Sequence, residues 1–352
     1  MPDSKVKKVN DWGQDSTSYV YSNPDGKICL TEQPTFSTHR SGWAYAIDSL
    51  SPLHNPSGVS FYGFLENEFY WQKDKTTLPF QHPWVGFLHN PQNYPWWFGP
   101  KGLPEVVVNS WEFQDSLEHC KGLFTLTEYH AKFLREFVDV PVNVLYHPSE
   151  IPEKQFSFEA FMKNAQKRIL NVGYWLRKVN STYYLPIDNS IYTKTKLLPY
   201  KEGSQPHKFV HELRQKELNF EYQTALEYNY YYSESTSHVE ELFALSNEEY
   251  DDIFCDNIIY LDMYTCSASN SIIESIARAT PILVNPIPPA IEYLGLDYPF
   301  YFRSIDEAVD KAFNMDLILQ AHEYLKNCET RKKLTAEYFL EDFKRSEIYE
   351  SI

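Results

Sequence analysis

The sequence lacks long apolar runs and paired cysteines. No stretch of its 352 residues approaches the roughly 20 consecutive apolar residues that a membrane-spanning helix needs. The first residues, MPDSKVKKVNDWGQDS, contain no apolar core of a signal peptide. The five cysteines are scattered, and none forms a CxxC pair or a spacing typical of zinc sites. Because such cysteines are typical of reduced thiols, we expect a soluble, cytoplasmic protein.

Basic residues are also scarce. The formal net charge is −16 at pH 7, with 32 Lys and Arg against 48 Asp and Glu. A chain of this charge repels nucleic acid and anionic membranes at long range, so we expect no nucleic-acid partner. Weak peripheral contact with a membrane stays open, and a local basic pocket for one anionic ligand remains compatible with the overall charge.

Apolar and aromatic residues, by contrast, are plentiful. They make up 43% and 16% of the chain, which is enough to form a globular core. A chain of this length is expected to form two domains of ordinary size. Strand-like and helix-like segments alternate along both halves, which is typical of the α/β class.

The clearest pattern runs from Ile258 to Gly295. An apolar strand is predicted over 258–261, and a turn of small residues leads from it into a helix over 271–278. Apolar residues recur along that helix at helical spacing. A second strand follows over 281–284. The order strand, turn, helix, strand predicts a βαβ unit.

Four residues near the start of this helix are candidates for ligand binding. Backbone N–H groups at Ser269, Asn270 and Ser271 can face a phosphate, since the first turn of a helix leaves such donors free. Glu274 lies one turn further, away from the apolar stripe, where its carboxylate can accept hydrogen bonds from ribose hydroxyls. A solvated helix carboxylate is the alternative interpretation of Glu274.

A second cluster follows the predicted strand 169–172. This strand reaches Gly173, and the loop after it carries Arg177 and Lys178 side by side. Two cations at the C-terminal end of a strand suit a pyrophosphate, because arginine grips two oxygens and lysine adds a point charge. An ordinary surface charge pair is the alternative.

The first half offers two further candidates. His89 ends the apolar run 84–89, where a following proline stops the strand. Open α/β sheets build their sites at such strand ends, although a purely structural histidine also fits. Ser41 and Gly42 precede a short amphipathic helix, either as a cleft turn or as an ordinary helix entry. Four aromatics after His89 suit either a sugar platform or core packing: Tyr94, Trp96, Trp97 and Phe98.

Several expectations concern secondary structure alone. We predict a strand over 106–109, a last strand over 297–302 and one helix over 331–346. Turn-forming clusters over 199–237 predict a partly mobile loop there, which includes the unexplained aromatic run 228–232. Asp251 and Asp252 are predicted to lie on a solvated helix face, and no metal ligand is assigned.

The run NSIIESIARATPILVN (270–285) resembles the nucleotide-sugar segment of retaining GT-B glycosyltransferases, especially family 4-like members. In that family the helix glutamate, here Glu274, holds the donor ribose. The glycine and cation pair at Gly173, Arg177 and Lys178 is similar to the family's diphosphate site, and His89 to its cleft histidine. One position departs from the pattern, because the family's second glutamate, eight residues earlier, is Cys266 here. The resemblance therefore does not identify the donor sugar.

The resemblance implies a GT-B fold, in which two Rossmann-like domains face each other across a cleft. It implies an acceptor-side domain over 1–150, a nucleotide-sugar domain over 151–335, and a C-terminal helix over 336–352 that crosses back to the first domain. The linker would lie between Pro148 and Gln166. His89, Arg177 and Lys178 would serve catalysis. The donor would contact Gly42, Gly173, Arg177, Lys178, Ser269, Asn270, Ser271 and Glu274.

The implied activity is transfer of a hexose from a UDP- or GDP-sugar to a hydroxyl of a glycan or another acceptor. The resemblance implies retention of configuration, a role in glycan biosynthesis, and no metal or tightly bound cofactor. Two alternatives stay open. One is a catalytically silent GT-B scaffold or carbohydrate-binding protein, which the loss of the family glutamate favours. The other is a nucleotide-sugar epimerase of the same fold, whose cleft carboxylates are not evident in this sequence.

Overall fold

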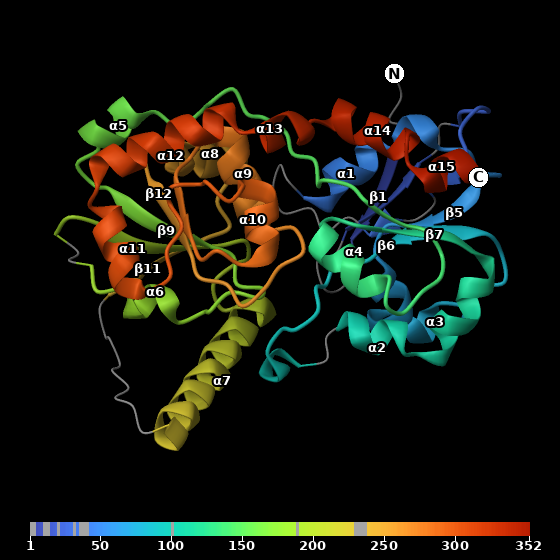
Figure 1. The fold of residues 1–352 in the computed structure, drawn as a ribbon, viewed down its shortest axis with the longest axis horizontal. Coiled ribbons are helices and arrows are strands. Elements are labelled where there is room, and N and C mark those ends of the chain that lie inside the picture. Colours follow the sequence, from blue (N-terminus) through green and yellow to red (C-terminus); the bar gives the residue numbers. More distant parts are fainter. Residues whose placement is uncertain are drawn as a thin grey trace.

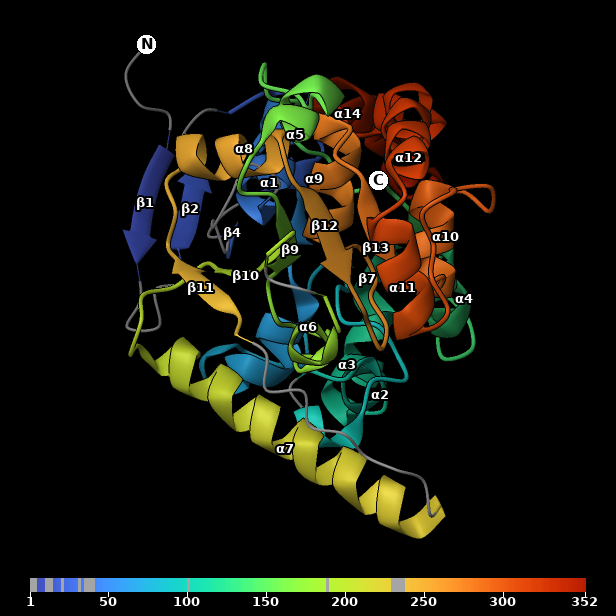
Figure 2. The ribbon, with the colours of Figure 1, turned by 90° about the vertical axis from the view of Figure 1, so that its left-hand side faces the viewer.

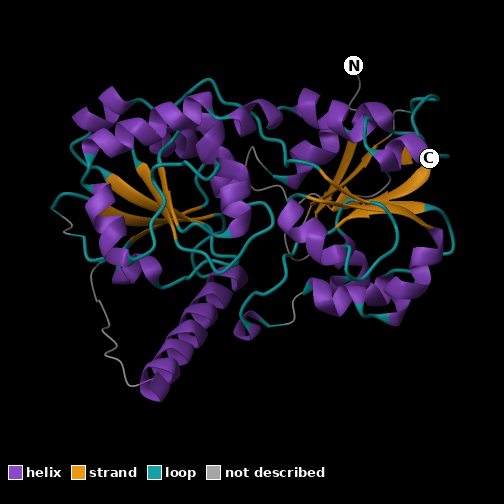
Figure 3. Cartoon of the chain, viewed as in Figure 1, coloured by secondary structure: helices purple, strands orange, loops and turns teal. Residues whose placement is uncertain are grey.

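Two parallel five-stranded sheets form two lobes that lie side by side (Figure 1). The computed structural model describes residues 5–9, 15–19, 22–30, 33–34, 42–99, 102–187, 190–228 and 238–352. Helices cover the faces of both sheets (Figure 3). The α/β class and the two-lobed layout expected from the sequence are thereby confirmed.

The N-terminal lobe is built on the sheet with strand order β3-β5-β6-β7-β8. Its central strand β6 is buried at every position and runs as an uninterrupted apolar segment, as strands covered on both faces do. The strands are β3 (Ile28–Cys29), β5 (Val59–Tyr62), β6 (Trp84–Phe87), β7 (Cys120–Thr125) and β8 (Val142–Val144). The helices of this lobe include α1 (Trp43–Ser49), α3 (Trp111–Ser116) and α4 (Glu128–Leu134).

The C-terminal lobe has the strand order β11-β10-β9-β12-β13. Because β9 and β12 are parallel neighbours, the loops that follow them leave the sheet at the same edge. The strands are β9 (Arg168–Val172), β10 (Thr193–Leu198), β11 (Glu240–Phe243), β12 (Ile258–Leu261) and β13 (Ile282–Val284). The helices of this lobe include α5 (Phe158–Lys163), α6 (Ser181–Tyr184), α8 (Asn247–Cys255), α9 (Asn270–Arg278), α10 (Pro288–Leu294), α11 (Ile305–Ala312) and α12 (Met315–Asn327).

The end of the chain returns to the N-terminal lobe (Figure 1). Phe339, Phe343 and Ile348 are buried in the same hydrophobic cluster as Phe61. The single helix predicted over 331–346 is wrong, because the chain breaks and the Thr335 hydroxyl caps a new helix by accepting from the Tyr338 N–H. Two helices cover this range, α13 (Glu329–Lys333) and α14 (Ala336–Lys344), and α15 (Glu347–Ser351) follows them.

Three other predictions of secondary structure need correction. The valine-rich stretch predicted as a strand is helix α2 (Pro104–Val108), which proline opens at its first position. The expected mobile loop contains the 24-residue helix α7 (Gln205–Tyr228), which projects from the lobe (Figure 2). Residues 229–232 of the aromatic run lie outside the described residues. The last predicted strand is reduced to one bridge between Val284 and Tyr301.

A small antiparallel sheet was not expected. It contains β1 (Lys5–Val9), β2 (Asp15–Tyr19) and β4 (Gln33–Pro34), in the order β1-β2-β4. Their polar sequences carry no apolar alternation that would predict strands.

The two lobes touch through hydrogen bonds and through an apolar cluster. Tyr293 of α10 donates its hydroxyl to the Leu126 carbonyl and accepts from the His147 N–H. Glu292 accepts from two backbone N–H groups at the start of α4. A cluster that we call the aromatic seam joins the lobes elsewhere. It contains Tyr94, Trp97 and Phe98 from the N-terminal lobe with Leu176, Val179 and Leu213 from the C-terminal lobe.

Among the described residues, every helix is too short or too polar to cross a lipid bilayer.

Candidate functional site

A cavity of about 1100 Å³ lies between the lobes and takes its lining residues from both of them. The N-terminal wall includes residues of α1 and of the loop after β6. The C-terminal wall includes residues of the loop after β9 and of the start of α9. Candidate residues that line it are His89, Gly173, Arg177, Ser269, Asn270, Ser271 and Glu274. The two halves of the sequence-predicted site therefore meet in one cavity.

Arg177 is fixed at the centre of the C-terminal wall. Its side chain is buried and donates four hydrogen bonds, two of them to the carbonyls of Val172 and Trp175 at 3.2 and 2.6 Å. The other two go to the hydroxyls of Ser269 and Ser271 at 3.2 and 3.1 Å. Burial lowers the pKa of this guanidinium, but an arginine stays charged in proteins. None of these four acceptors is a carboxylate, so the fixed cation faces the cavity without a direct countercharge among them.

Helix α9 begins beside this cation. Its N-terminus has no side-chain cap, although Ser269 stands at the capping position, because that hydroxyl accepts from Arg177 instead. Eight other helices of the described chain are capped by a serine, threonine or asparagine side chain: α3, α4, α5, α8, α11, α12, α14 and α15. The uncapped start of α9 adds its backbone donors and dipole to the charge of Arg177, which makes an anion site.

Glu274 lies one turn into α9 and is 1% exposed. The solvated-carboxylate alternative is therefore wrong, although the side chain does line the cavity. The hydroxyl of Tyr250 on α8 donates a hydrogen bond to Glu274 Oε2. This contact orients the carboxylate, which has about four acceptor positions and lines the cavity.

The N-terminal wall is aromatic and contains two histidines. The ring of His89 stacks on Phe64 at 3.9 Å between centroids and meets Trp43 edge-on at 4.3 Å. Within the described structure neither ring nitrogen of His89 has a hydrogen-bond partner. Trp43, Phe64, Tyr70 and Trp71 also line the cavity. Such faces suit the apolar side of a sugar ring.

His147 is a second cavity histidine, which the sequence did not indicate. Its Nδ1 lies 2.8 Å from the Pro148 carbonyl oxygen and must donate to it, so Nε2 is left as an acceptor. Burial lowers the pKa of His147 to about 4, which keeps the ring neutral at pH 7. The aromatics predicted after His89 lie elsewhere: Tyr94, Trp97 and Phe98 are buried in the aromatic seam, and Trp96 is 77% exposed.

The remaining candidates differ in position. Gly173 adopts φ +73°, a conformation that favours glycine, where β9 turns toward Arg177. Lys178 is not among the lining residues, and its ammonium pairs with Asp262 at 2.9 Å. Gly42 is buried at the start of α1 next to the lining residue Trp43. Ser41 lies outside the described residues.

Two buried carboxylates hold the loops that carry the site, and the sequence predicted neither. Glu66 accepts from the backbone N–H groups of His89 and Asn90, both at 2.6 Å. Glu217 on α7 does the same for Val179 and Asn180, which directly follow the two predicted cations. The residue types around either glutamate gave no sign that backbone N–H groups distant in sequence would bind it.

Cys266 occupies the position where the resemblance expects a glutamate. It lines the cavity and is 4% exposed. Burial raises the pKa of its thiol to about 12, so it stays protonated and uncharged. A thiol is a weak hydrogen-bond acceptor, and recognition of sugar hydroxyls here would need other groups.

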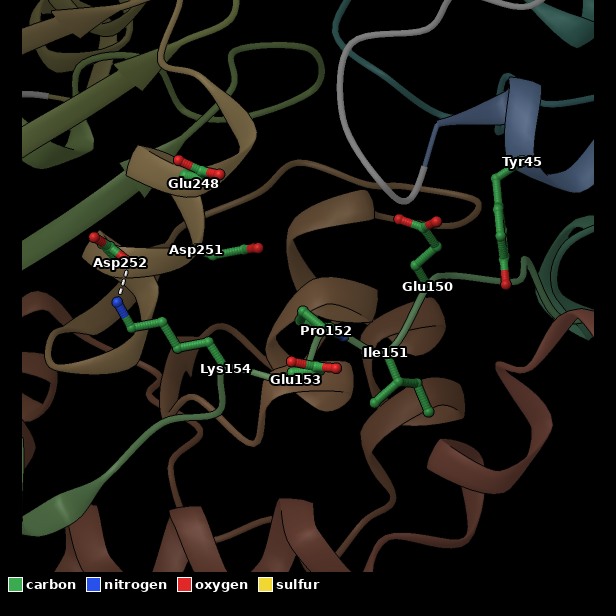
Figure 4. A pocket seen from close by; sticks show the side chains of 9 residues that line it. All are labelled: Tyr45, Glu150, Ile151, Pro152, Glu153, Lys154, Glu248, Asp251 and Asp252. Atoms are coloured by element: carbon green, nitrogen blue, oxygen red, sulfur yellow. Dashed lines mark hydrogen bonds and ion pairs between the residues drawn. The ribbon is translucent and has the colours of Figure 1, made fainter.

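A second cavity of about 540 Å³ lies where α8 faces the segment 150–154 (Figure 4). Five of its lining residues are acidic, which disfavours a phosphate ligand. Asp251 is buried and pairs with Arg278, so the solvated face predicted for it is wrong. Asp252 is exposed and pairs with Lys154.

The fold resembles those of solved glycosyltransferase structures, whereas no protein-family model and no curated protein matches the sequence. An α,α-trehalose-phosphate synthase (UDP-forming) from Burkholderia vietnamiensis matches with TM-score 0.52 and 11% identity, over 85% of this chain and 73% of that chain. Trehalose-6-phosphate synthase from E. coli bound with UDP-2-fluoro glucose matches with TM-score 0.50 and 13% identity, over 86% of this chain and 77% of that chain.

A third structure is S. aureus TarM in complex with fondaparinux, α-GlcNAc-glycerol and UDP. It matches with TM-score 0.52 and 13% identity, over 97% of this chain and 63% of that chain. At these identities the likeness concerns the fold. The chain has the GT-B fold, with its cavity between the two lobes.

Proposed function

We propose that this protein is a glycosyltransferase that moves a hexose from a nucleotide-diphosphate donor to an acceptor hydroxyl, with retention and without a metal ion. The observation that carries the proposal is the buried Arg177 guanidinium, fixed between Ser269 and Ser271 at the uncapped start of α9. A buried cation beside free helix N–H groups is matched best by a diphosphate.

Glu274 extends this proposal to the nucleoside. Its carboxylate lies one turn beyond the phosphate end of α9 and is held by Tyr250, so it can accept two ribose hydroxyls. Of the two bases considered, uracil has the better support, because solved structures of the same fold contain UDP or a UDP-sugar analogue.

The sugar and acceptor would occupy the N-terminal wall. His89 and His147 face the cavity from ordered positions, and four aromatic side chains surround them. These groups are suited to bind a neutral ring and its hydroxyls. Gly42 and Lys178 do not line the cavity and would act indirectly. Gly42 starts the helix that carries Trp43, and Lys178 pairs with Asp262.

In the reaction, the bond between the anomeric carbon and the β-phosphate oxygen breaks, and its electron pair stays on the phosphate. Arg177 and the N–H groups of Asn270 and Ser271 stabilise the charge that develops there. The acceptor oxygen forms the new bond to the same face, and its proton passes to the departing phosphate oxygen. Fixed donors and a cation supply the stabilisation, so this scheme requires no metal.

The direct test is a donor panel with the purified chain. Free UDP, GDP, ADP and TDP are compared first by thermal shift, since a ligand at 100 times its Kd adds about 2.7 kcal/mol of stability. UDP- and GDP-sugars are then assayed for nucleotide release with and without candidate acceptors. Stabilisation by UDP and release of UDP from a UDP-sugar support the proposal, and neither occurring for any nucleotide contradicts it.

Cys266 favours a second candidate, a silent scaffold that binds a nucleotide without transferring sugar, because the position lacks a carboxylate for donor hydroxyls. In that case the thermal shift with UDP appears, yet no nucleotide is released from any donor and acceptor pair. An epimerase would instead convert the sugar of the donor, which product analysis by NMR detects.

A further inference from the structure

Three metal-binding side chains meet at the N-terminal end of α7, outside the cavity described above. His207 and His211 are one turn apart on this helix, and Glu241 lies on the edge strand β11, close to α7 in Figure 2. One ligand atom from each lies within 4.8 Å of the others. The two Nε2 atoms are 3.0 Å apart, and His207 Nε2 is 3.8 Å from Glu241 Oε2.

We propose that His207, His211 and Glu241 bind one divalent transition-metal ion of the Zn²⁺ class. Zinc takes imidazole nitrogens at about 2.0–2.1 Å, so two nitrogens on one tetrahedral ion lie roughly 3.3 Å apart. The observed separation is close to this value, and the carboxylate needs only a small shift. Two nitrogens and one oxygen suit zinc better than Mg²⁺ or Ca²⁺, which prefer oxygen ligands. Water would fill the fourth position.

A neighbouring hydroxyl orients the carboxylate of the proposed site. Glu241 supplies negative charge, which offsets Arg214 and Lys196 nearby. Its Oε1 accepts from the Tyr183 hydroxyl at 2.7 Å, which orients the carboxylate and leaves Oε2 toward the histidines.

Metal binding requires one proton to move. His207 Nδ1 accepts from the Gly203 N–H at 2.8 Å, so the proton of His207 sits on Nε2 and points to His211. When the metal takes Nε2, this proton passes to Nδ1 and the Gly203 N–H turns to solvent. Gly203 lies in an exposed turn with nothing within 4 Å of its Cβ direction, so the turn has room for this change.

The ion would fix a part of the cavity wall. The same turns of α7 present Gln205, Phe209 and Glu212 to the cavity, while His207 and His211 face β11. A metal that joins the helix to the sheet edge therefore holds this wall in place. The site stands apart from the diphosphate site, and its existence does not depend on the proposed activity.

Zinc binding by the full chain, freed of metal by chelation, tests the proposal directly. Zn²⁺ alone is titrated at pH 7.5 in competition with a chromogenic chelator, and we expect one ion per chain. His211→Ala, which changes an exposed side chain, is expected to weaken binding at least tenfold. Glu241→Gln keeps an acceptor for Tyr183 and should weaken it similarly. His119→Ala, in the other lobe, is the matched control and should bind like the wild type.

Substitution with Co²⁺ adds a readout of geometry, because four-coordinate cobalt gives intense visible absorption. Circular dichroism of each variant separates lost binding from lost folding. The proposal is overturned if the wild-type chain binds no Zn²⁺, if folded H211A binds it as tightly as the wild type, or if H119A reduces binding as much as H211A does.

Discussion

The two walls of the cavity differ in chemistry although both are built on the same kind of sheet. The C-terminal wall carries the buried cation Arg177, the uncapped start of α9 and the carboxylate of Glu274. The N-terminal wall carries aromatic rings and histidines, and His147 is neutral at pH 7. An anion and its ribose therefore suit the C-terminal wall, and a neutral sugar suits the N-terminal wall. The first three predictions below test that division.

The largest effect is expected from Arg177→Ala, which removes the fixed cation of the C-terminal wall. Loss of one group that stabilises developing charge costs about 10² to 10³ in rate, so we expect kcat/KM for the donor to fall by that amount. Arg177→Lys keeps the charge but loses the paired geometry and should give an intermediate rate. Near wild-type turnover by the alanine variant would refute the division.

Glu274→Gln should come next, with an effect on nucleotide binding. Hydrogen bonds to charged groups are worth about 1.5–3 kcal/mol, so we expect the Kd of UDP to rise by roughly 10- to 100-fold. Wild-type protein should bind 2′-deoxy-UDP more weakly than UDP, and the variant should lose this preference. Calorimetry with both nucleotides measures it, and an unchanged preference would show that Glu274 does not hold the ribose.

His89→Ala probes the N-terminal wall. Loss of one neutral hydrogen bond costs about 0.5–1.5 kcal/mol, so turnover should fall by roughly 3- to 10-fold. The affinity for UDP should stay the same, because the nucleotide lies on the other wall. Steady-state kinetics and thermal shift are compared on one preparation. An equal loss of UDP affinity would mean that the walls are not divided in this way.

A last effect, on stability and not on the reaction, is expected from Glu217, which holds the loop after Arg177. Burial raises the pKa of its carboxyl from 4.5 to about 7. The folded chain therefore keeps a proton that the unfolded chain has released, and this group makes stability fall as the pH rises from about 4.5 to about 7. In Glu217→Gln that contribution should vanish from urea-unfolding curves measured across this range. An unchanged slope would place the pH dependence elsewhere.

Much of the C-terminal wall was predictable, because strand ends and helix starts are local signals. Gly173, Arg177 and the turn at Ser269 each follow a clear apolar strand, and parallel strands bring such ends to one edge. The helix α7 was not predictable in this way. Its sequence is polar on most positions, and what fixes it is tertiary: Val210, Leu213 and Glu217 bury one face.

The N-terminal lobe was harder to predict for the same physical reason. The three valines before Asn109 favour a strand locally, yet Pro104 opens a helix there and packing retains it. Glu66 binds a backbone N–H group that is distant in sequence. The role of His147 depends on its tautomer. A pattern of residue types records neither feature. Both lobes have the same kind of fold, but only the residues of the C-terminal wall could be predicted from local sequence patterns.

The aromatic seam has a consequence for turnover. Because Phe98 and Leu213 come from different lobes, drawing the lobes apart wets this apolar surface at a cost of about 25 cal/mol per Å². We therefore expect the ligand-free protein to adopt a closed arrangement of the lobes. We also expect release of the nucleotide product to be the slowest step of turnover. A kcat that falls as solvent viscosity rises would support this expectation. Leu213→Ala should then weaken the aromatic seam and speed release of the nucleotide.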